Sequence, residues 1–573
     1  MSCTVAQYLA LRLREIGAAH IFTVPGDYCA GFLDVIDSTP GIERVPTINE
    51  LGAGYAADGY ARFRGAGAAC VQYGVGSFSM LNAVAGSYVE FAPVAVISSS
   101  PSASDRLLEV KQNILFHHST GDLAADQIVF ESVTVASIVI TSACGAPEAI
   151  DSALTAMLTA RRPVYIEVIK SAWTLECPEP AGKLQARHCA SDPAALAQAV
   201  TSARDAIAKA QRPVFFFGVE LQRLRLQEVA QRLVDNTQIP FTTTSVAKTV
   251  LDEAQPLFAG TYAGPASVPY TNDLVTKSDC VIALGTIITD DYLGLMASSF
   301  STMIRVSHGE TRVGNTYFPV VTLEDFLPAL LAALDTNPLP KHDAPAIPAP
   351  RSAKSAADDA TITFERFYEA VGDFVLQPDV RDSHVLILGE STSLYVFGNL
   401  FGLPADSFVA QAAWGSLGHE TGAALGVALA TGKRPLVVAG DGGFMMICQE
   451  ISSLVRAKAN AAVFVMSNQG YAIEQAFVDL NAFKPGGKFA PFDDLPAWDY
   501  LALAKAFGAR GKRLEHMHDL RHFLKELPAL DGPTLIEVVV PKQDLAPQLA
   551  RLAGAPPATL KYQRQERPKL RLA

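Results

Sequence analysis

Two stretches decide the fold: Pro435-Leu-Val-Val-Ala-Gly-Asp-Gly-Gly-Phe444 and Ala461-Ala-Val-Phe-Val-Met-Ser-Asn-Gln-Gly-Tyr471. Each begins with a short apolar run, partly β-branched, which predicts a buried strand of a parallel sheet. Each run ends at a polar turn that contains glycine. Asp441 and Asn468 therefore follow the carboxyl ends of two strands, where open α/β sheets bind their ligands.

The turn after the first strand has the composition of a phosphate site. Gly440, Gly442 and Gly443 let the backbone approach a phosphate closely, and a helix that begins there offers free N–H groups. Asp441 and Asn468 supply hard oxygen atoms, which suit a Mg²⁺ ion that also holds phosphate oxygens. The alternative is a pair of ordinary strand-to-helix turns, because Gly-Asp-Gly by itself is a common sequence.

Composition narrows the class of protein. The 573 residues are enough for roughly three or four domains, and 49% hydrophobic content supports large cores. A net charge of −12 argues against a general nucleic-acid surface. The eight cysteines contain no CxxC pair, which indicates buried thiols in a reducing compartment and neither a disulfide framework nor a zinc site. We see no signal peptide and no apolar run of about 18 residues, so we expect a cytoplasmic protein without a membrane span.

Alternation of apolar strands and helices predicts an α/β fold of three doubly wound domains with mainly parallel sheets. We place a first domain at 1–180, a middle domain at 195–340, a third domain at 360–545 and a tail at 546–573. Stretches rich in Pro or weak in periodicity, at 177–193 and 337–359, are the expected linkers.

Further motifs occur in the first and third blocks. The first block contains Pro25-Gly-Asp27, then Asn49-Glu50 before a Gly/Ala-rich helix, and then His117-His118. The third contains Trp414-Gly-Ser-Leu417-Gly before the Gly-Asp-Gly turn, and Asn468-Gln-Gly-Tyr-Ala-Ile-Glu474 after the second strand. In this order the motifs resemble the thiamine diphosphate (ThDP)-dependent 2-oxo-acid decarboxylases, the group of pyruvate, indolepyruvate, phenylpyruvate and branched-chain decarboxylases. The resemblance covers essentially the whole chain.

The resemblance implies ThDP and Mg²⁺ as cofactors. Glu50 would hydrogen-bond the aminopyrimidine ring and favour the tautomer that removes the thiazolium C2 proton, giving the ylid. Leu417 would lie beneath the bent cofactor, and the carbonyl of Gly415 would accept from its amino group. The structural alternatives are a Glu that stabilises a helix macrodipole and a Leu in the core. The implied metal ligands are Asp441, Asn468 and the carbonyl of Gly470, and the other implied cofactor contacts are Gly440, Gly442, Gly443, Tyr471 and Ile473.

An acid–base set is implied around the substrate: Asp27, His117, His118 and Glu474, with Glu50. Loss of CO₂ leaves an enamine that must be protonated before an aldehyde departs, and His and carboxylates serve such proton relays. Adjacent histidines cannot point the same way along a helix or strand. We therefore expect one to face the substrate and the other to order Asp27 or a water. The alternatives are surface or core histidines and an exposed helical Glu.

Three segments depart from the family pattern: 389–393, 72–74 and 419–422. Gly74 and its small neighbours could leave room for a bulky side chain. The sequence therefore predicts non-oxidative decarboxylation of an aromatic or branched-chain 2-oxo acid of the phenylpyruvate or indolepyruvate type. The alternatives are a pyruvate decarboxylase, or a ThDP-dependent carboligase or synthase.

In the family the cofactor lies between the first domain of one subunit and the third domain of another. The resemblance thus implies a homodimer at minimum and a homotetramer as the usual state, with a small-molecule substrate and neither nucleic acid nor membrane as partner. For the middle block, Gly285-Thr-Ile-Ile-Thr-Asp290 after a strand could bind FAD or a nucleotide, but we favour a structural or regulatory role. A non-catalytic protein that kept the fold is a further alternative.

Overall fold

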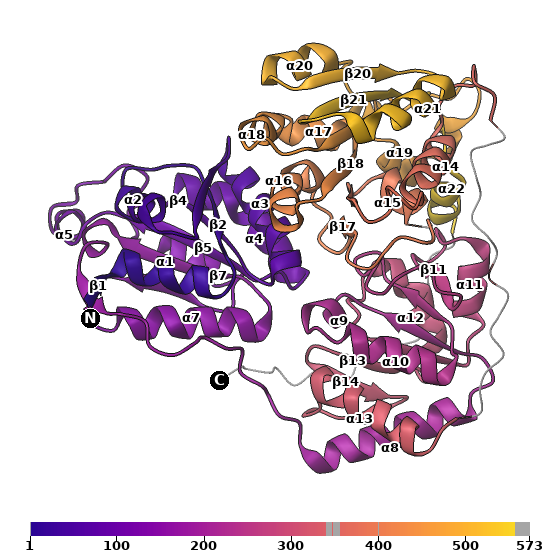
Figure 1. Ribbon diagram of the computed structural model, residues 1–573, viewed down its shortest axis with the longest axis horizontal. Helices are drawn as coiled ribbons and strands as arrows, with labels where there is room; N and C mark the ends of the chain where they lie inside the picture. Colours follow the sequence, from indigo (N-terminus) through magenta and orange to yellow (C-terminus); the bar gives the residue numbers. More distant parts are fainter. Residues whose placement is uncertain (1, 340–346, 348–355, 399, 556–573) are drawn as a thin grey trace.

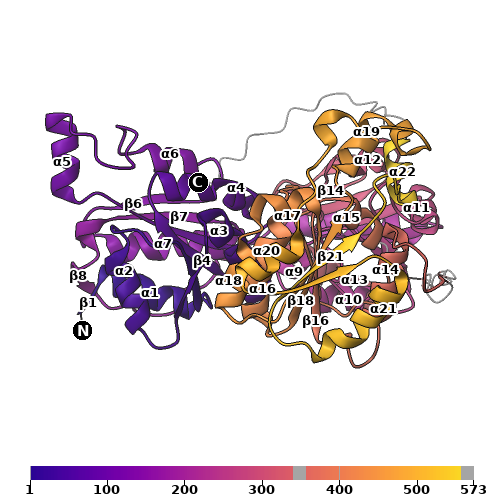
Figure 2. The same ribbon diagram turned by 90° about the horizontal axis from the view of Figure 1, so that it is seen from above.

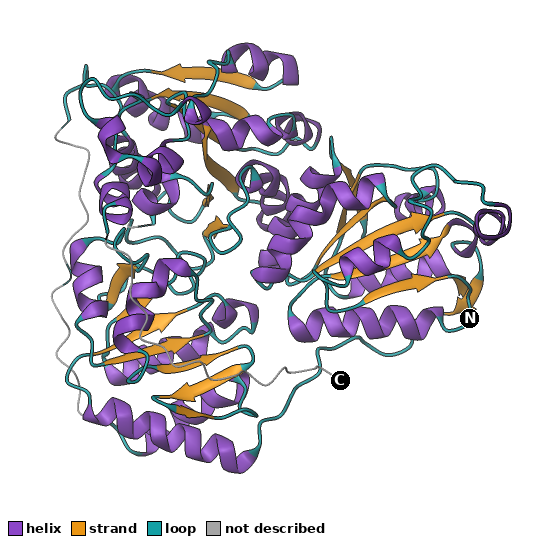
Figure 3. Ribbon diagram, turned by 180° about the vertical axis from the view of Figure 1, so that it is seen from behind, coloured by secondary structure: helices purple, strands orange, loops and turns teal. Residues whose placement is uncertain are grey.

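The structure is a computed structural model that describes residues 2–339, 347, 356–398 and 400–555. Three α/β units follow one another along the chain (Figure 1): the first in indigo and purple, the middle in magenta, and the third in orange and yellow. Each unit has helices on both faces of its sheet (Figure 3). The predicted fold class is confirmed, whereas the domain bounds stay a prediction. Most of the linker at 337–359 and most of the tail at 546–573 lie outside the described residues.

The first unit is built on six parallel strands in the order β3-β2-β4-β5-β7-β6. Its strands are β2 (His20–Thr23), β3 (Glu43–Pro46), β4 (Gly67–Gln72), β5 (Val94–Ser100), β6 (Ser137–Ile140) and β7 (Val164–Ile169). Its helices are α1 (Val5–Glu15), α2 (Ala30–Ser38), α3 (Glu50–Arg64), α4 (Val75–Val89), α5 (Ala103–Gln112), α6 (Ala125–Phe130) and α7 (Ala146–Ala160). An antiparallel ribbon of β1 (Ser2–Thr4) and β8 (Glu176–Pro178) ties the start of the unit to its end.

The third unit repeats this strand order as β17-β16-β18-β19-β21-β20, again all parallel. Its strands are β16 (His384–Leu388), β17 (Phe408–Ala410), β18 (Arg434–Gly440), β19 (Ala462–Ser467), β20 (Arg510–Leu514) and β21 (Thr534–Val539). Its helices are α14 (Phe364–Val375), α15 (Thr392–Phe397), α16 (His419–Thr431), α17 (Asp441–Ile447), α18 (Glu450–Arg456), α19 (Ala472–Val478), α20 (Tyr500–Phe507), α21 (Met517–Glu526) and α22 (Pro547–Ala553).

The middle unit has the strand order β11-β10-β9-β12-β13-β14-β15, with an antiparallel edge from β13 onward. Its strands are β9 (Pro213–Phe217), β10 (Phe241–Thr243), β11 (Phe258–Thr261), β12 (Cys280–Leu284), β13 (Ile304–Ser307), β14 (Glu310–Val313) and β15 (Thr316–Tyr317). Its helices are α8 (Pro193–Lys209), α9 (Glu220–Arg223), α10 (Gln227–Thr237), α11 (Pro269–Thr276), α12 (Leu293–Ser299) and α13 (Leu323–Thr336). Every helix in the described ranges is too short or too polar to span a bilayer.

Reversal of strand order opens a crevice at the carboxyl ends of the strands, where ligands of such sheets bind. The reversal falls between β2 and β4 in the first sheet and between β16 and β18 in the third. In the middle sheet it falls between β9 and β12, and there the two following turns touch. A Cβ built on Gly218 would lie 1.9 Å from the carbonyl oxygen of Gly285. At the reversal point of the middle sheet the two turns therefore pack backbone against backbone.

Helices α3 and α16 join the first and third units through their backbones (Figures 1 and 2). A Cβ on Gly426 would lie 1.8 Å from the carbonyl oxygen of Ala56, and one on Gly59 would lie 2.6 Å from that of Ala423. The glycine- and alanine-rich sequence of both helices permits this approach. Buried side chains of α3 belong to one apolar cluster with those of β16 and β18, so the two units share a core.

A buried ion network lies across the same helix pair. The Arg62 guanidinium contacts Asp58 at 2.7 Å and Glu90 at 2.8 Å, and His419 of α16 contacts Asp58 at 2.8 Å. Glu90 also accepts a hydrogen bond from the backbone N–H of Ala413, at 2.7 Å. Burial alone would raise the pKa of Asp58, but Arg62 and His419 lower it below its usual range. Each charge in this buried network therefore needs its partner, because an unpaired buried charge would destabilise the fold.

Arg62→Leu should lower the free energy of unfolding by about 3–5 kcal/mol, because it leaves two buried carboxylates without their cation. Chemical denaturation followed by circular dichroism measures the loss. The stabilisation from Asp58 is present above its unfolded pKa and is lost as pH falls through its lowered folded value. The matched control is Arg44→Leu, which removes an exposed pair with Asp37 and should cost about 1 kcal/mol or less. Equal losses in the two variants would contradict the role of the network.

Candidate active site

The two deciding stretches form neighbouring turns at the crevice of the third sheet. Asp441 begins α17 directly after β18, and Asn468 follows β19. The Asp441 carboxylate accepts hydrogen bonds from the backbone N–H of Gln469 at 2.6 Å and of Gly442 at 3.0 Å. Burial raises its pKa to about 6. One carboxylate, that of Asp441, therefore joins the two turns and is available to bind a cation.

The remaining atoms of these turns fit a metal and a diphosphate. The Asn468 side chain is 5% exposed, and among the described residues its Nδ2 atom has no hydrogen-bond partner. The carbonyl of Gly470 accepts from the Ala472 N–H at 3.0 Å and keeps a second lone pair. Hard oxygens beside a buried carboxylate match the ligand preference of Mg²⁺.

Glycines line the same turns because side chains have no room there. A Cβ on Gly442 would lie 2.2 Å from Cε1 of Tyr471, so the Tyr471 ring packs directly over the glycine. A Cβ on Gly443 would lie 3.0 Å from an oxygen of Glu420. Gly440 ends β18 and is only partly buried. Glycine at these positions lets the backbone at 440–443 approach a phosphate closely.

The segment around Leu417 is anchored on the first unit. The Trp414 indole donates to Asn82 at 2.8 Å, and the Asn82 amide donates to Ser416 at 2.7 Å. Gly415 has φ +71°, a conformation that favours glycine. Leu417 is only partly buried, so it is not an ordinary core residue. These contacts present Gly415 and Leu417 beside the glycine turn.

Glu50 begins α3, after an Asn49 cap whose side chain accepts from the Gly52 N–H at 2.7 Å. The Glu50 carboxyl lies beside Gly76, where an added Cβ would be 3.3 Å from Oε1. Glu450 of α18 accepts from the Asn49 N–H at 3.3 Å, and burial raises its pKa. The sequence analysis missed Glu450, which fixes the start of α3 from the third unit.

Asp27 is exposed at the crevice of the first sheet. It accepts from the Gln72 side chain at 3.1 Å and pairs with Lys170 at 3.4 Å. The expectation that one histidine orders Asp27 or a water stays a prediction, and in the described chain the groups that contact the Asp27 carboxylate are Gln72 and Lys170. Gln72 ends β4, next to β2, so the sheet brings it to Asp27. The only sequence signal for Gln72 was its position at the end of a buried strand.

His117 and His118 lie in an exposed turn, with ring centroids 6.2 Å apart. The Tyr73 hydroxyl donates to the carbonyl of His117 at 2.6 Å, and the Tyr73 ring meets that of His118 edge-on. His118 has φ +73°, a left-handed conformation. The turn is neither helix nor strand, so the expected alternation of the two rings does not apply.

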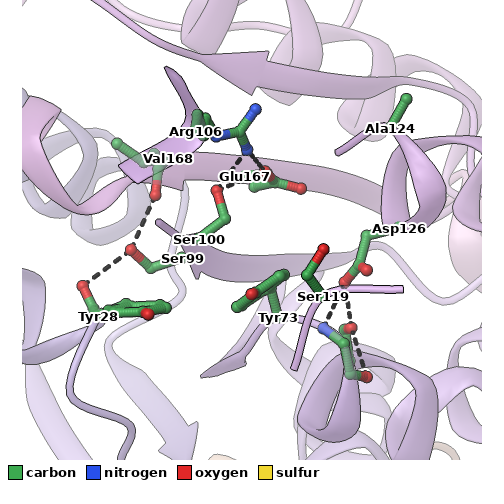
Figure 4. Close-up of polar contacts among 12 residues, drawn as sticks. Tyr28, Tyr73, Ser99, Ser100, Arg106, Ser119, Ala124, Asp126, Glu167 and Val168 are labelled. Carbon is green, nitrogen blue, oxygen red and sulfur yellow. Dashed lines mark hydrogen bonds and ion pairs between the residues drawn. The ribbon is translucent and has the colours of Figure 1, made fainter. Parts of the chain in front are cut away.

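A buried polar network supports the base of this histidine turn (Figure 4). Asp126 accepts from the Gly74 N–H at 2.9 Å, from the Ser77 hydroxyl and from the Tyr165 hydroxyl at 3.2 Å. Beside it, Glu167 of β7 pairs with Arg106 of α5. The network fixes the backbone at Gly74, against which the histidine turn packs.

Glu474 lies exposed in the first turn of α19. Ile473, beside it, packs with Ala263, Ala266 and Tyr395, so α19 rests on the middle unit. The predicted residues thus form two groups, one at the crevice of each sheet. The third-unit group comprises Gly415, Leu417, 440–443, Asn468, Gly470, Tyr471, Ile473 and Glu474. Within the described residues, no hydrogen bond joins this group to Asp27, Glu50, His117 or His118.

Two further buried carboxyls lie in the third crevice and were missed as site residues. Burial raises the pKa of Glu390 to about 8, with Asp291 adding to the shift, and burial raises the pKa of Glu420 to about 7. A Cβ on Gly415 would lie 3.6 Å from Cγ of Glu390. The sequence marked both segments only as departures from a pattern.

Comparison with known proteins identifies all three units. Residues 3–127 match the model "Thiamine pyrophosphate enzyme, N-terminal TPP binding domain", 200–334 match the central domain, and 395–538 match the C-terminal TPP binding domain. The chain is 31% identical over 522 residues to a pyruvate decarboxylase of Kluyveromyces marxianus, covering 88% of this chain and 89% of that one. It is 29% identical to a pyruvate decarboxylase of Kluyveromyces lactis (97% and 99% covered). It is also 29% identical to pyruvate decarboxylase isozyme 2 of Saccharomyces cerevisiae (97% and 99% covered).

These matches confirm ThDP as cofactor, with Mg²⁺ as its partner metal. The Asp441 carboxylate and the Asn468 amide are side chains of the kind that fits this pair. They also confirm a lyase that decarboxylates 2-oxo acids. The chain belongs to the ThDP-dependent 2-oxo-acid decarboxylases.

Proposed function

We propose that the protein decarboxylates pyruvate without oxidation, giving acetaldehyde and CO₂. Relatives named pyruvate decarboxylase align with this chain over nearly its whole length. The sequence analysis favoured an aromatic or branched-chain substrate because Gly74 could leave space. A Cβ on Gly74 would lie 2.2 Å from the carbonyl oxygen of His118. The histidine turn therefore occupies that space, and the argument for a bulky substrate loses its basis.

The residues of the chain have distinct proposed tasks. Asp441, Asn468 and the carbonyl of Gly470 hold Mg²⁺, and the backbone at 440–443 approaches the diphosphate. Glu50 bonds the aminopyrimidine ring, Leu417 supports the bent cofactor, and the Gly415 carbonyl accepts from its amino group. When bound, ThDP supplies the carbanion-stabilising chemistry of the reaction.

We assign proton transfer to the side chains at the mouth of the site. Asp27, His117, His118 and Glu474 are all exposed in the described chain, so each can reach a substrate or a water. Histidine and carboxylate side chains are common general acids and bases in proton transfer. The Gln72 amide and the Lys170 ammonium orient the Asp27 carboxylate.

We infer that a second copy of the chain completes the site, in a homodimer or in a homotetramer made of two such dimers. The two half-sites are both edged by exposed apolar side chains, which favours burial against a partner. Val75, 60% exposed, precedes Gly76 beside Glu50, while Met446 (51%) and Phe477 (55%) flank the third-unit turns. Pairing two chains would bring one half-site of each kind together.

The substrate prediction is a higher kcat/KM for pyruvate than for phenylpyruvate in the ThDP- and Mg²⁺-loaded enzyme. The physical reason is the filled space beside Gly74. Aldehyde release is measured for both acids with a coupled alcohol dehydrogenase and checked by mass spectrometry. A clear preference for phenylpyruvate would overturn the proposal and restore the aromatic alternative.

A further inference from the structure

A buried carboxyl group stands in the crevice of the third sheet with part of its hydrogen-bonding capacity unused. Glu420 is the second residue of α16 and is 1% exposed. In the part of the chain that the structure describes, its Oε2 atom has no hydrogen-bond partner. Such a group costs free energy unless something else uses it.

The carboxyl group touches two glycines that belong to different turns. A Cβ on Gly389 would lie 2.8 Å from Cδ of Glu420, and one on Gly443 would lie 3.0 Å from its Oε1. Gly389 directly follows β16, and Gly443 lies in the first turn of α17, after β18. The Glu420 carboxyl therefore reaches the place where the strand order reverses, which is where sheets of this kind bind their ligands.

The surroundings of Glu420 disfavour its charge. Burial raises the pKa of Glu420 to about 7, although the N–H groups of Gly418 and Glu420 act in the opposite direction. Glu390 faces it from the turn after β16, Tyr55 faces it from α3, and Asp441 begins α17 nearby. The adjacent His419 is turned toward Asp58. No ion pair with Glu420 forms within the described residues, so near neutral pH the carboxyl takes up and releases a proton.

We propose that Glu420 is a cofactor-binding residue that recognises the diphosphate of ThDP in its protonated form. The neutral carboxyl donates a hydrogen bond to a diphosphate oxygen, whereas the carboxylate repels the anion. The inference rests on the proposed diphosphate site at 440–443. It makes retention of the cofactor dependent on pH, with tighter binding on the acid side of neutrality.

The test measures the dissociation constant of ThDP at saturating Mg²⁺ by calorimetry, between pH 6 and 8.5, for the wild type and for Glu420→Gln. If only the protonated form binds, the wild-type affinity falls about thirtyfold over this range. Gln is neutral at every pH and keeps a donor, so the variant should lack this fall. Because the diphosphate and the metal titrate equally in both proteins, the ratio of the two constants isolates Glu420.

Glu420→Thr serves as a second variant of smaller volume and should also lose the additional pH dependence. Parallel pH profiles of wild type and variants would overturn the role of Glu420 and leave the diphosphate site standing. Failure of the site itself is distinguishable, because Asp441→Ala would then bind ThDP as tightly as the wild type.

Discussion

Glu50→Gln should lower the turnover number by about 10²–10⁴-fold while the protein stays folded, as expected for loss of one acid–base group. The amide keeps the shape of the side chain but cannot exchange a proton with the aminopyrimidine ring. Within the described residues the Glu50 carboxyl makes no hydrogen bond, so the change strands no partner. Steady-state turnover of pyruvate measures the effect, and calorimetry verifies that ThDP still binds.

The control is Glu43→Gln on β3 of the same unit. The Glu43 side chain is 74% exposed, and its replacement should leave turnover and thermal stability unchanged. Near-normal turnover of Glu50→Gln would remove Glu50 from the catalytic set. It would leave the family assignment intact, because that assignment rests on the whole chain.

Asp441→Ala should weaken binding of ThDP with Mg²⁺ by at least about a hundredfold, more than the loss of an outer-shell partner of a metal. The variant removes a proposed metal ligand, which is also the carboxylate that joins the two turns through the N–H groups of Gln469 and Gly442. Calorimetric titration of the cofactor measures the affinity, and circular dichroism confirms the fold.

Asp382→Ala is the control, since the Asp382 side chain is 77% exposed in the same unit. Unchanged cofactor affinity in Asp441→Ala would refute the proposed metal site.

The two variants can also be tested together by mixing their subunits. If sites are shared between chains, random pairing of Glu50→Gln and Asp441→Ala subunits in equal amounts makes about half of the dimers hybrids with one intact site of two, so the mixture regains about a quarter of normal activity.

Strands with strong apolar runs were predictable from the sequence. The stretches that become β18 and β19, and their counterparts β4 and β5, are buried along their lengths, and burial on both faces dictates a continuous apolar run. The short ribbon of β1 and β8 was missed because its paired residues, such as Cys3 and Cys177, lie 174 positions apart in the chain. The antiparallel edge from β13 to β15 was missed because its strands are short and are separated by tight turns at Gly309 and Gly314.

The candidate site was predictable where its residues follow strands directly. Asp441 and Asn468 are of this kind, since neighbouring parallel strands end at one edge. Contacts that depend on side-chain direction were not predictable. The carbonyl of His118 fills the space at Gly74, and the amide of Gln72 reaches Asp27 across the sheet. Glu420 is the clearest case, because its carboxyl meets glycines 31 and 23 positions away in the chain.

The contact of α3 with α16 has a consequence for how this protein can change over generations. On an exposed helix, replacing Gly by Ala usually stabilises by roughly 0.5–1 kcal/mol. At residue 426 the same single methyl group would collide with the Ala56 carbonyl and wedge two whole domains apart. We therefore expect substitutions at such positions, remote from the chemistry, to be tolerated poorly. An exchange as small as Gly to Ala there would disable the enzyme without altering any group that meets its substrate.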